Sequence, residues 1–413
     1  MLDTENIGHA DLRGGTPPWR RAAQNLPSAV LRENTRCQVL IVGAGITGAL
    51  MAEHLTSRGL NVIILEKEEP IRGSTAASTS MLQWEIDRSL TDLTAFYGFE
   101  RAANIYRRSL HAVSGLKALV HAQQLHCGFR DRNSLYLAGT ETDPNELQAE
   151  HKLRQRAELP GFFLDRRKLM SEFGFERSSS ILSPGSADAD PVCLTHALLQ
   201  TAIGRGARLV IGDAQVFDGG SKSVAVGLAD DHVIEAEHVV LATGYAMPDI
   251  VHSDLHKASS SWAIATAPQL PTALWRGGVL IWEACEKYLY ARTTTDNRIV
   301  VGGEDDDAVI DQDDRDRLMP SKKEIILAKL KALHPAAHAT ADFAWSGAFG
   351  QTADGLPLIG RVPGHRRLYA AYGYGGNGIT FSFVASRIIG HIIEGGFENW
   401  FDDFAIERPA PKP

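Results

Sequence analysis

The sequence has few cysteines and no hydrophobic segment long enough to cross a membrane. Its four cysteines are Cys37, Cys127, Cys193 and Cys285, and no two of them have the C-x-x-C spacing of a metal or redox site. This pattern predicts reduced structural thiols in a reducing compartment. The longest apolar stretch, residues 39–52, carries three glycines and is shorter than the roughly 20 residues that a membrane helix needs.

The chain also lacks an excess of positive charge. Its formal net charge is −8 and its pI about 6.0, which argues against a nucleic-acid-binding surface. The N-terminal stretch MLDTENIGHADLRGG is polar and has no apolar signal-peptide core, so we expect a cytoplasmic protein. Four histidines show no metal-ligand spacing, and we expect no metal site; they are His196, His256, His334 and His391.

What is present is the composition of an ordinary globular enzyme. The 413 residues are 44% hydrophobic and 22% charged, which predicts two or three domain-sized units. Residues 1–35 are rich in turn formers and lack periodicity, so they predict an N-terminal arm. Next come a predicted strand over 37–42, a helix over 46–57 and a strand over 61–65.

The remaining segments alternate between helical and strand patterns. Residues 88–125 have helical spacing, and 321–335 predict an amphipathic helix capped by Ser321. A meander over 214–241 ends in a buried strand, and a glycine-rich loop over 373–380 opens the last helix. The proline-rich tail, residues 396–413, predicts a peripheral segment.

The stretch VLIVGAGITG carries the first functional signal. In a G-x-G-x-x-G fingerprint, Gly43 allows the tight turn, Gly45 admits the pyrophosphate, and Gly48 lets helix and strand pack closely. The phosphates then face a helix N-terminus, whose free N–H groups favour anions. Glu66 ends the second strand and suits two ribose hydroxyls, and its charge disfavours the 2′-phosphate of NADP. These residues alone allow either NAD or FAD.

Two distant segments favour FAD over NAD. The buried strand HVVLATG ends at Thr243 and Gly244, and the loop GYGGNGIT precedes the last helix. FAD is long, so its flavin end needs a second cradle from distant parts of the chain, whereas NAD folds do not need such a helix start. FAD would then be a prosthetic group that stays bound.

At this point the chain resembles the D-amino-acid oxidase/glycine oxidase superfamily of FAD-dependent amine and amino-acid oxidoreductases. The resemblance is carried by VLIVGAGITG…LEK, RGSTAASTSML, DPVCLTHALL, VVLATGY, TADGLPLIG and YGYGGNGITFS. It implies a Rossmann-like α/β FAD-binding domain interleaved with a substrate domain built on a mostly antiparallel sheet. The implied FAD-binding segments are 36–110, 184–250 and 346–395. The substrate domain would comprise 111–183 and 251–345.

The resemblance also assigns cofactor-binding residues. The phosphate loop and adenosine end comprise Gly43, Gly45, Ile46, Gly48, Glu66, Lys67 and Val216. The loop under the pyrophosphate and ribityl chain, and the turn beside the cofactor, comprise Arg72, Gly73, Ser74, Thr79, Ser80, Thr243 and Gly244. The loop at the flavin pyrimidine edge comprises Gly375, Gly376, Asn377, Gly378, Ile379 and Thr380.

The implied reaction is oxidation of a C–N bond. Hydride passes to flavin N5, and the imine that forms is hydrolysed. The helix N-terminus near Ile379 would stabilise the negative charge that develops on the flavin, and Asn377 is a candidate tuner of its electronics. Some relatives attach FAD through a histidine or cysteine, but residues 73–83 contain neither and position 347 is glycine. We therefore expect non-covalent FAD.

The substrate position departs from the family pattern. Amino-acid oxidases of this family place an arginine about five residues before the Asp of a TPDGLP motif, to bind a carboxylate. Here that Asp is Asp354 and the earlier position is Phe349. This weakens a simple amino acid as substrate and favours an amine or an N-substituted amino acid.

Arg292 is the best remaining carboxylate partner. It alternates with Tyr288 and Tyr290 on one strand, so these three side chains share a face. Either that face lines the substrate pocket, or it points outward with Arg292 paired to Asp296. Trp345 and Phe349 share another face, as an apolar pocket wall or as core. Glu283 suits an ammonium group, although a surface role is favoured.

Several functional alternatives remain open from sequence. The electron acceptor is either O₂, as in an oxidase, or a carrier, as in a dehydrogenase. A non-catalytic or electron-relaying FAD subunit of an amine dehydrogenase complex is a second hypothesis. An NAD-linked dehydrogenase is a third, although the C-terminal loop argues against it. Oligomeric state is not encoded in any visible motif.

Overall fold

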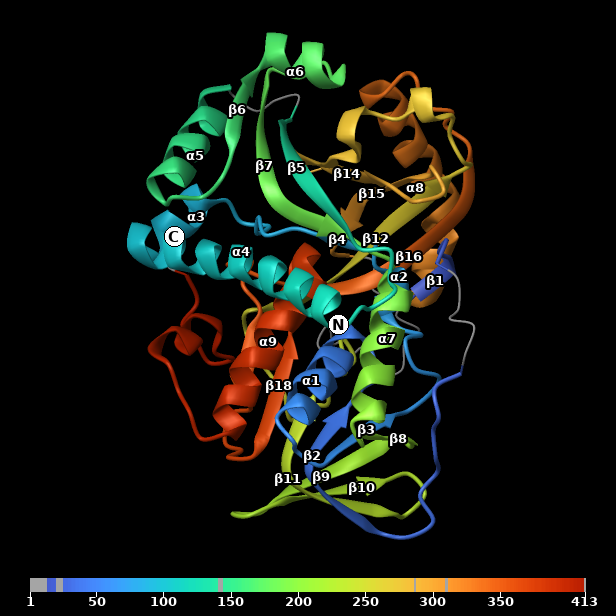
Figure 1. Cartoon of the computed structure of the whole chain (residues 1–413), viewed down its shortest axis with the longest axis vertical. Coiled ribbons are helices and arrows are strands. Elements are labelled where there is room, and N and C mark those ends of the chain that lie inside the picture. The colour runs from blue at the N-terminus through green and yellow to red at the C-terminus, as the bar shows by residue number, and fades with distance from the viewer. Residues whose placement is uncertain (1–12, 20–24, 140–143, 286, 309–310, 412–413) are drawn as a thin grey trace.

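The computed structural model describes residues 13–19, 25–139, 144–285, 287–308 and 311–411, arranged around two β-sheets. Figure 1 shows the sheets at opposite ends of the long axis, with α4 (Phe99–Ala122) lying across the middle of the molecule. The chain passes between the sheets several times. The predicted architecture, a Rossmann-like unit interleaved with a mostly antiparallel sheet, is therefore confirmed.

The small sheet contains the nucleotide-binding unit. β2 (Thr35–Val42) is its centre and pairs in parallel with β3 (Val62–Glu66) and β11 (Val233–Leu241). The other strands are β8 (Arg208–Ile211), β9 (Ala214–Gly219), β10 (Val224–Leu228), β17 (Leu358–Arg361) and β18 (Leu368–Tyr372). β9, β10 and β11 form the predicted antiparallel meander.

Three helices cover one face of the small sheet, as Figure 1 shows. They are α1 (Ile46–Ser57), α7 (Pro191–Gly204) and α9 (Gly378–Ile393). α1 coincides with the predicted helix, and α7 begins where Asp190 accepts backbone hydrogen bonds from Val192 and Cys193. The central strands are apolar on both faces because both are covered, as expected for parallel strands.

The large sheet lies at the other end of the long axis from the small sheet (Figure 1). Its strands, in spatial order, are β1 (Arg13–Thr16), β16 (Ala341–Thr352), β12 (His256–Thr266), β15 (Ile299–Asp306), β14 (Leu289–Thr293), β13 (Leu280–Ala284), β5 (Arg130–Ala138), β7 (Ser179–Asp188) and β4 (Met81–Leu82), with β6 (Phe162–Asp165) beside β7. Its pairings are antiparallel except for β13 with β5. The remaining helices are α2 (Ser74–Ala77), α3 (Leu90–Tyr97), α5 (Pro144–Arg156), α6 (Arg166–Phe173) and α8 (Gln312–Leu333).

The structure differs from the sequence prediction at several boundaries. α8 starts nine residues before the predicted Ser321 cap, because Asp311 accepts the first N–H groups, and Pro320 lies within it. β1 belongs to the large sheet, so part of the predicted arm is structured; residues 1–12 and 20–24 lie outside the described part. The predicted domain limit at 346 falls within β16, and the limit at 110 within α4.

The C-terminal tail is not peripheral. Phe401 and Phe404 pack into the main core, and Arg408 is 5% exposed. The Arg408 guanidinium binds both oxygens of Asp354 at 2.7 Å, and the Asp354 carboxylate also accepts the Tyr97 hydroxyl. The proline-rich sequence of the tail does not indicate this packing, because Asp354, the partner of Arg408, lies 54 positions earlier in the chain.

Candidate active site

A cavity of about 2190 Å³ lies between the two sheets. One end is lined by Glu66 and Val216 of the small sheet, and the other by Tyr288 and Phe349 of the large sheet. Most of the predicted cofactor residues line it: Gly43, Gly45, Ile46, Glu66, Lys67, Arg72, Gly73, Ser74, Thr79, Val216, Thr243, Gly244, Gly375, Gly376, Asn377, Gly378 and Ile379. A cavity of this length suits an extended dinucleotide.

The phosphate loop has the backbone that its glycines predict. Gly43 has φ +109°, and a Cβ there would lie 2.4 Å from the Ala242 carbonyl oxygen. A Cβ on Gly48 would lie 1.9 Å from the Gly43 carbonyl oxygen, so Gly48 packs α1 against the loop rather than lining the cavity. α1 begins without a side-chain cap at Gly45, which leaves its N-terminus suited to a phosphate.

Glu66 closes the adenosine end. Its Oε2 accepts the Ala44 N–H at 2.7 Å, and its Oε1 accepts the Glu68 N–H at 3.2 Å. Burial raises the pKa of Glu66, and the backbone hydrogen bonds oppose that shift. Lys67 forms an ion pair with Asp213 at 3.5 Å, and Val216 is exposed at the same end.

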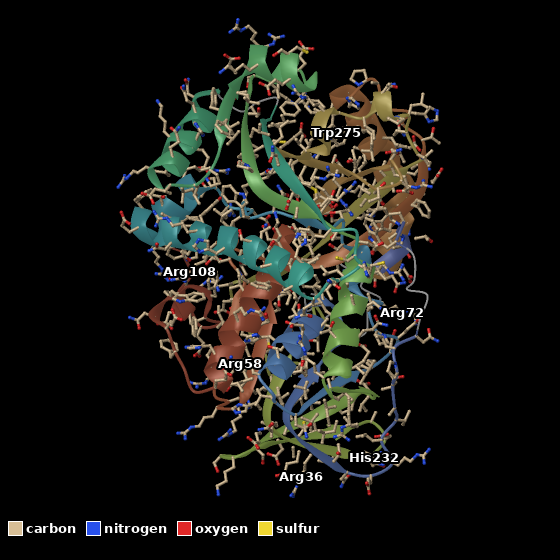
Figure 2. The ribbon with its side chains drawn as sticks, in the orientation of Figure 1. Arg36, Arg58, Arg72, Arg108, His232 and Trp275 are labelled. Atoms are coloured by element: carbon tan, nitrogen blue, oxygen red, sulfur yellow. The ribbon has the colours of Figure 1, made fainter. Side chains whose placement is uncertain are left out.

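The segment after β3 supplies the second wall. Arg72 pairs with Glu68 at 3.6 Å and points outward (Figure 2). Thr75 Oγ1 accepts the Ile46 N–H at 2.9 Å, which joins this segment to the start of α1. Within the described residues, the Ser74 hydroxyl is buried without a hydrogen-bond partner, as expected where a polar cofactor belongs. Ser80 does not line the cavity.

The C-terminal glycine loop lies at the opposite end of the cavity. Asn377 Nδ2 donates to the carbonyls of Gln83 and Glu85, at 3.2 and 2.8 Å. Thr380 Oγ1 donates to the same Gln83 carbonyl at 2.9 Å and does not line the cavity. The two side chains therefore fix the loop to residues 83–85, and the proposed electronic role of Asn377 stays a prediction.

Aromatic side chains form the substrate end. Tyr288 and Tyr290 line the cavity with ring centroids 6.0 Å apart, and Trp345 and Phe349 line it from β16, the pocket-wall alternative of the two that the sequence left open. Trp345 Nε1 donates to the Ala77 carbonyl at 2.8 Å, which orients the indole. Glu283 also reaches the cavity, but it binds Arg177 at 2.7 Å and the Leu289 N–H at 3.1 Å.

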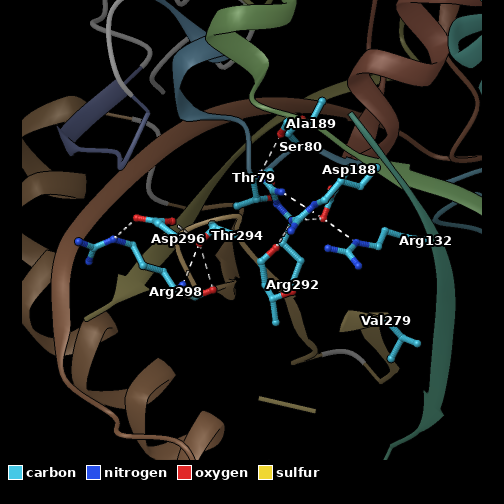
Figure 3. Close-up of polar contacts among 12 residues, drawn as sticks. Thr79, Ser80, Arg132, Asp188, Ala189, Val279, Arg292, Thr294, Asp296 and Arg298 are labelled. Carbon is cyan, nitrogen blue, oxygen red and sulfur yellow. Dashed lines mark hydrogen bonds and ion pairs between the residues drawn. The ribbon is translucent and has the colours of Figure 1, made fainter. Parts of the chain in front are cut away.

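Arg292 does not line the cavity, and this corrects the prediction. Its Nε donates to the Thr79 carbonyl at 2.6 Å, its Nη2 to the Ala189 carbonyl at 3.0 Å, and its Nη1 pairs with Asp188 at 3.4 Å (Figure 3). The alternative partner was also wrong, because Asp296 binds Arg298. Strand alternation placed Arg292 beside the tyrosines, but residues 79 and 189 cover that end of β14.

An Arg292→Met variant is expected to lose about 1–3 kcal/mol of stability, because a buried hydrogen-bonded group is removed. The loss is limited because Asp188 keeps Arg130 and Arg132, at 2.7 and 3.0 Å. Urea unfolding measures it. The preference between amines with and without a carboxylate should not change; a KM increase confined to carboxylate-bearing amines would restore Arg292 to the substrate site.

Asp87 and Asp305 are among the cavity acids that sequence reasoning missed. Asp87 Oδ2 accepts the Gly376 N–H at 2.7 Å, although the two residues are 289 positions apart. Asp305 Oδ2 accepts the Tyr288 hydroxyl. Neither acid belongs to a sequence motif, so only the fold reveals them.

No group of three or more potential metal ligands occurs in the part of the chain that the structure describes. Within the same ranges, no helix combines the length and hydropathy that a membrane span requires.

The small sheet is Rossmann-like, and α1 begins at the glycine fingerprint with a cap residue, Gly45, that has no side chain. A second glycine loop lines the same cavity as the aromatic side chains of the large sheet. Together these features define a dinucleotide-dependent flavoprotein. Comparison with known families agrees. The chain belongs to the family of FAD-dependent oxidoreductases, whose model matches residues 38–392. Enzymes of this family use FAD. The predicted cofactor is therefore confirmed, and the alternative of an NAD-linked dehydrogenase is excluded.

The relatives include amine and amino-acid oxidoreductases. The chain is 25% identical to gamma-glutamylputrescine oxidoreductase of Escherichia coli over 401 residues, covering 94% of this chain and 90% of that protein. It is 25% identical to glycine oxidase of Bacillus licheniformis, covering 90% and 98%. The glycine oxidase structure from Geobacillus kaustophilus superposes with a TM-score of 0.77 at 20% identity, covering 91% and 99%.

We expect the FAD to be released intact by acid. Gly347 lines the cavity where a cysteine would be needed, and residues 73–83 carry neither histidine nor cysteine. Precipitating the yellow protein with acid should leave a colourless pellet and a supernatant absorbing at about 450 nm. A pellet that stays yellow would contradict non-covalent binding.

Proposed function

We propose that the enzyme oxidises the C–N bond of an amine or an N-substituted amino acid. The observation that carries this proposal is the continuity of the cavity, which joins the predicted flavin loop at Gly375–Ile379 to an aromatic chamber. FAD, when bound, supplies the two-electron acceptor for a hydride from the carbon beside the nitrogen. The relatives named gamma-glutamylputrescine oxidoreductase and glycine oxidase support the same reaction class.

The residues of the chamber have binding and orienting roles in this proposal. Trp345, Phe349 and Tyr290 form walls that hold the substrate carbon chain and exclude water. Tyr288, fixed by its hydrogen bond to Asp305, presents an oriented phenol. No arginine occurs at position 349, so an α-carboxylate has no bidentate partner there.

A substrate panel tests the reaction class. Purified enzyme is mixed anaerobically with primary amines, secondary amines and amino acids, and flavin bleaching is followed at about 450 nm. Bleaching by at least one amine supports the proposal, and bleaching by none of them, with FAD bound, contradicts it. Stopped-flow reoxidation of the bleached enzyme by O₂ then separates an oxidase from a dehydrogenase that uses a carrier.

The proposed location is the cytoplasm. None of the four cysteines, all of which lie in the described residues, forms a disulfide. Burial raises the pKa of Cys37 to about 12 and that of Cys127 to about 11, which keeps these thiols protonated and unreactive. This supports structural thiols in a reducing compartment.

A further inference from the structure

Asp87 lies against the loop Gly375–Thr380, which the family resemblance assigns to the flavin edge. Its Oδ2 accepts the Gly376 N–H at 2.7 Å, and a Cβ on Gly375 would lie only 2.1 Å from the same oxygen. Gly375 has φ +56°, so the turn depends on glycine both for its backbone and for room beside the carboxylate. The Asp87 side chain is exposed to the cavity rather than packed in the core.

A second carboxylate adds to the negative field around Asp87. Asp305 lines the same cavity, where its Oδ2 accepts the Tyr288 hydroxyl. Its Oδ1 is buried and has no hydrogen-bond partner within the described ranges. Burial raises the pKa of Asp305, while the neighbouring Ser261 hydroxyl opposes the shift.

Three other acids of the cavity, Glu85, Glu150 and Glu283, are paired with arginines. Glu85 and Glu150 flank the buried Arg154, at 3.8 and 2.7 Å, and Glu283 binds Arg177. Asp87 and Asp305 instead accept hydrogen bonds from a backbone N–H and a phenol. Arg88, the neighbour of Asp87 in sequence, is the basic residue of this part of the described cavity wall.

The two positions expected to bind a carboxylate give no support to an anionic substrate. Phe349 occupies the first, and Arg292 is held outside the cavity by Asp188 and two carbonyls. An anion beside Asp87 and Asp305 would meet like charge, whereas a cation would meet opposite charge. Electrostatic complementarity of this kind selects among ligands of similar shape.

We propose that Asp87 is a specificity-determining residue whose carboxylate binds a second, non-reacting ammonium group of the substrate, so that the enzyme selects diamines over monoamines and amino acids. Asp305 adds to the field that attracts this cation. The inference rests on the proposed oxidation of amines and names the class of amine.

Three probes of similar length test the charge preference: 1,4-diaminobutane, butylamine and 4-aminobutanoate. They differ at one end, which is cationic, uncharged or anionic. For a probe that bleaches the flavin, anaerobic stopped-flow mixing with the oxidised, FAD-loaded enzyme gives the Kd from the concentration dependence of the bleaching rate. For a probe that does not bleach it, calorimetric titration gives the Kd. We expect the diamine to bind at least about tenfold more tightly than butylamine, and the anion most weakly.

An Asp87→Asn variant removes the charge and keeps an oxygen that can accept the Gly376 N–H. We expect it to retain FAD and to bind the diamine and butylamine about equally, with 4-aminobutanoate improved. Glu172→Gln removes one exposed charge outside the active-site cavity and should keep the wild-type order of affinities. Equal affinity of the wild-type enzyme for diamine and butylamine would overturn the proposal whatever the variant does.

The pH dependence gives an independent readout. The cavity walls remove water from Asp87 and, with Asp305, raise its pKa to about 6, while the Gly376 N–H and Arg88 oppose the shift. Tyr288 and Tyr245 are the other titratable groups whose charge couples to it, and both stay neutral in this range because burial raises their pKa values. Diamine affinity should therefore be nearly constant from about pH 7 upward while the far amine stays protonated, and fall by up to about tenfold per unit below pH 6.

This loss of affinity at low pH should be absent when wild-type enzyme binds butylamine and when Asp87→Asn binds the diamine. If affinity falls in the same way in these two measurements and in the binding of the diamine to wild type, the assignment to Asp87 is overturned. If no probe or other amine bleaches the flavin, the proposed reaction fails. If amines bleach it without regard to the charge at the far end, the reaction stands and the diamine inference fails.

Discussion

A Gly48→Ala variant is expected to lose its FAD. The added methyl group would lie 1.9 Å from the Gly43 carbonyl oxygen and 3.0 Å from the Gly43 carbonyl carbon, and both are backbone atoms. Backbone cannot rotate away as a side chain can, so α1 must shift away from the phosphate loop. The helix N-terminus and the turn at Gly43 would then no longer face the pyrophosphate together.

The expected weakening of FAD binding is at least 100-fold, or about 2.7 kcal/mol. FAD content per chain after purification measures it first, and fluorescence titration of the apoprotein with FAD gives the Kd. Gly204→Ala is the matched control, because Gly204 also lies in a helix but has open space around it. If Gly48→Ala retains full FAD content, the close approach of α1 to the phosphate loop at Gly48 is not required for FAD binding, and the prediction is wrong.

Removing the side chain of Arg408 is expected to cause the largest loss of stability. Arg408→Ala leaves the Asp354 carboxylate, which is fully buried, without its bidentate partner. Breaking a buried ion pair from one side costs about 3–5 kcal/mol. Arg408 also donates to the carbonyls of Leu356 and Pro357, so the chain leading into β17 would loosen.

Urea unfolding of the FAD-loaded protein measures this loss. Arg36→Ala is the control, because Arg36 pairs with Glu235 at 2.8 Å on the surface of the small sheet (Figure 2), and such pairs contribute less than about 1 kcal/mol. Burial alone would raise the pKa of Asp354, but Arg408 lowers it below its usual value. In Arg408→Ala burial raises that pKa, so the stability difference between wild type and the variant should shrink as pH falls from the variant's raised pKa, through the ordinary value of about 4, to the lowered wild-type pKa. An unchanged urea midpoint would mean that the tail is peripheral after all.

The two variants probe different parts of one active site. Gly48 governs the approach of α1 to the cofactor loop, whereas Asp354 lies just beyond β16, the strand that carries Trp345 and Phe349 to the substrate end. Loss of the contacts of the tail should thus disturb the substrate end of the cavity more than the phosphate loop. The C-terminal residues contribute to the site without lining the cavity.

The sequence by itself determined the nucleotide-binding unit and the class of cofactor. The fingerprint, the acid at position 66 and the last glycine loop act through backbone conformation and over short spans, so residue type and spacing were enough to predict them. Strand alternation also predicted that Tyr288 and Tyr290 share one face and that Trp345 and Phe349 share another, but it left open whether these faces line the pocket; in the structure all four residues line the cavity.

Only the tertiary structure decided which charged residues face the cavity. Arg292 shares a strand face with two tyrosines of the cavity, yet residues 79 and 189 cover it and Asp188 binds it. Asp87 has no motif and meets its partner 289 residues away. Charge pairing depends on contacts between distant segments, which local periodicity does not encode. The sequence therefore suggested Arg292 as the charged residue of the substrate site, whereas the fold puts Asp87 in the cavity, and the proposed specificity depends on Asp87.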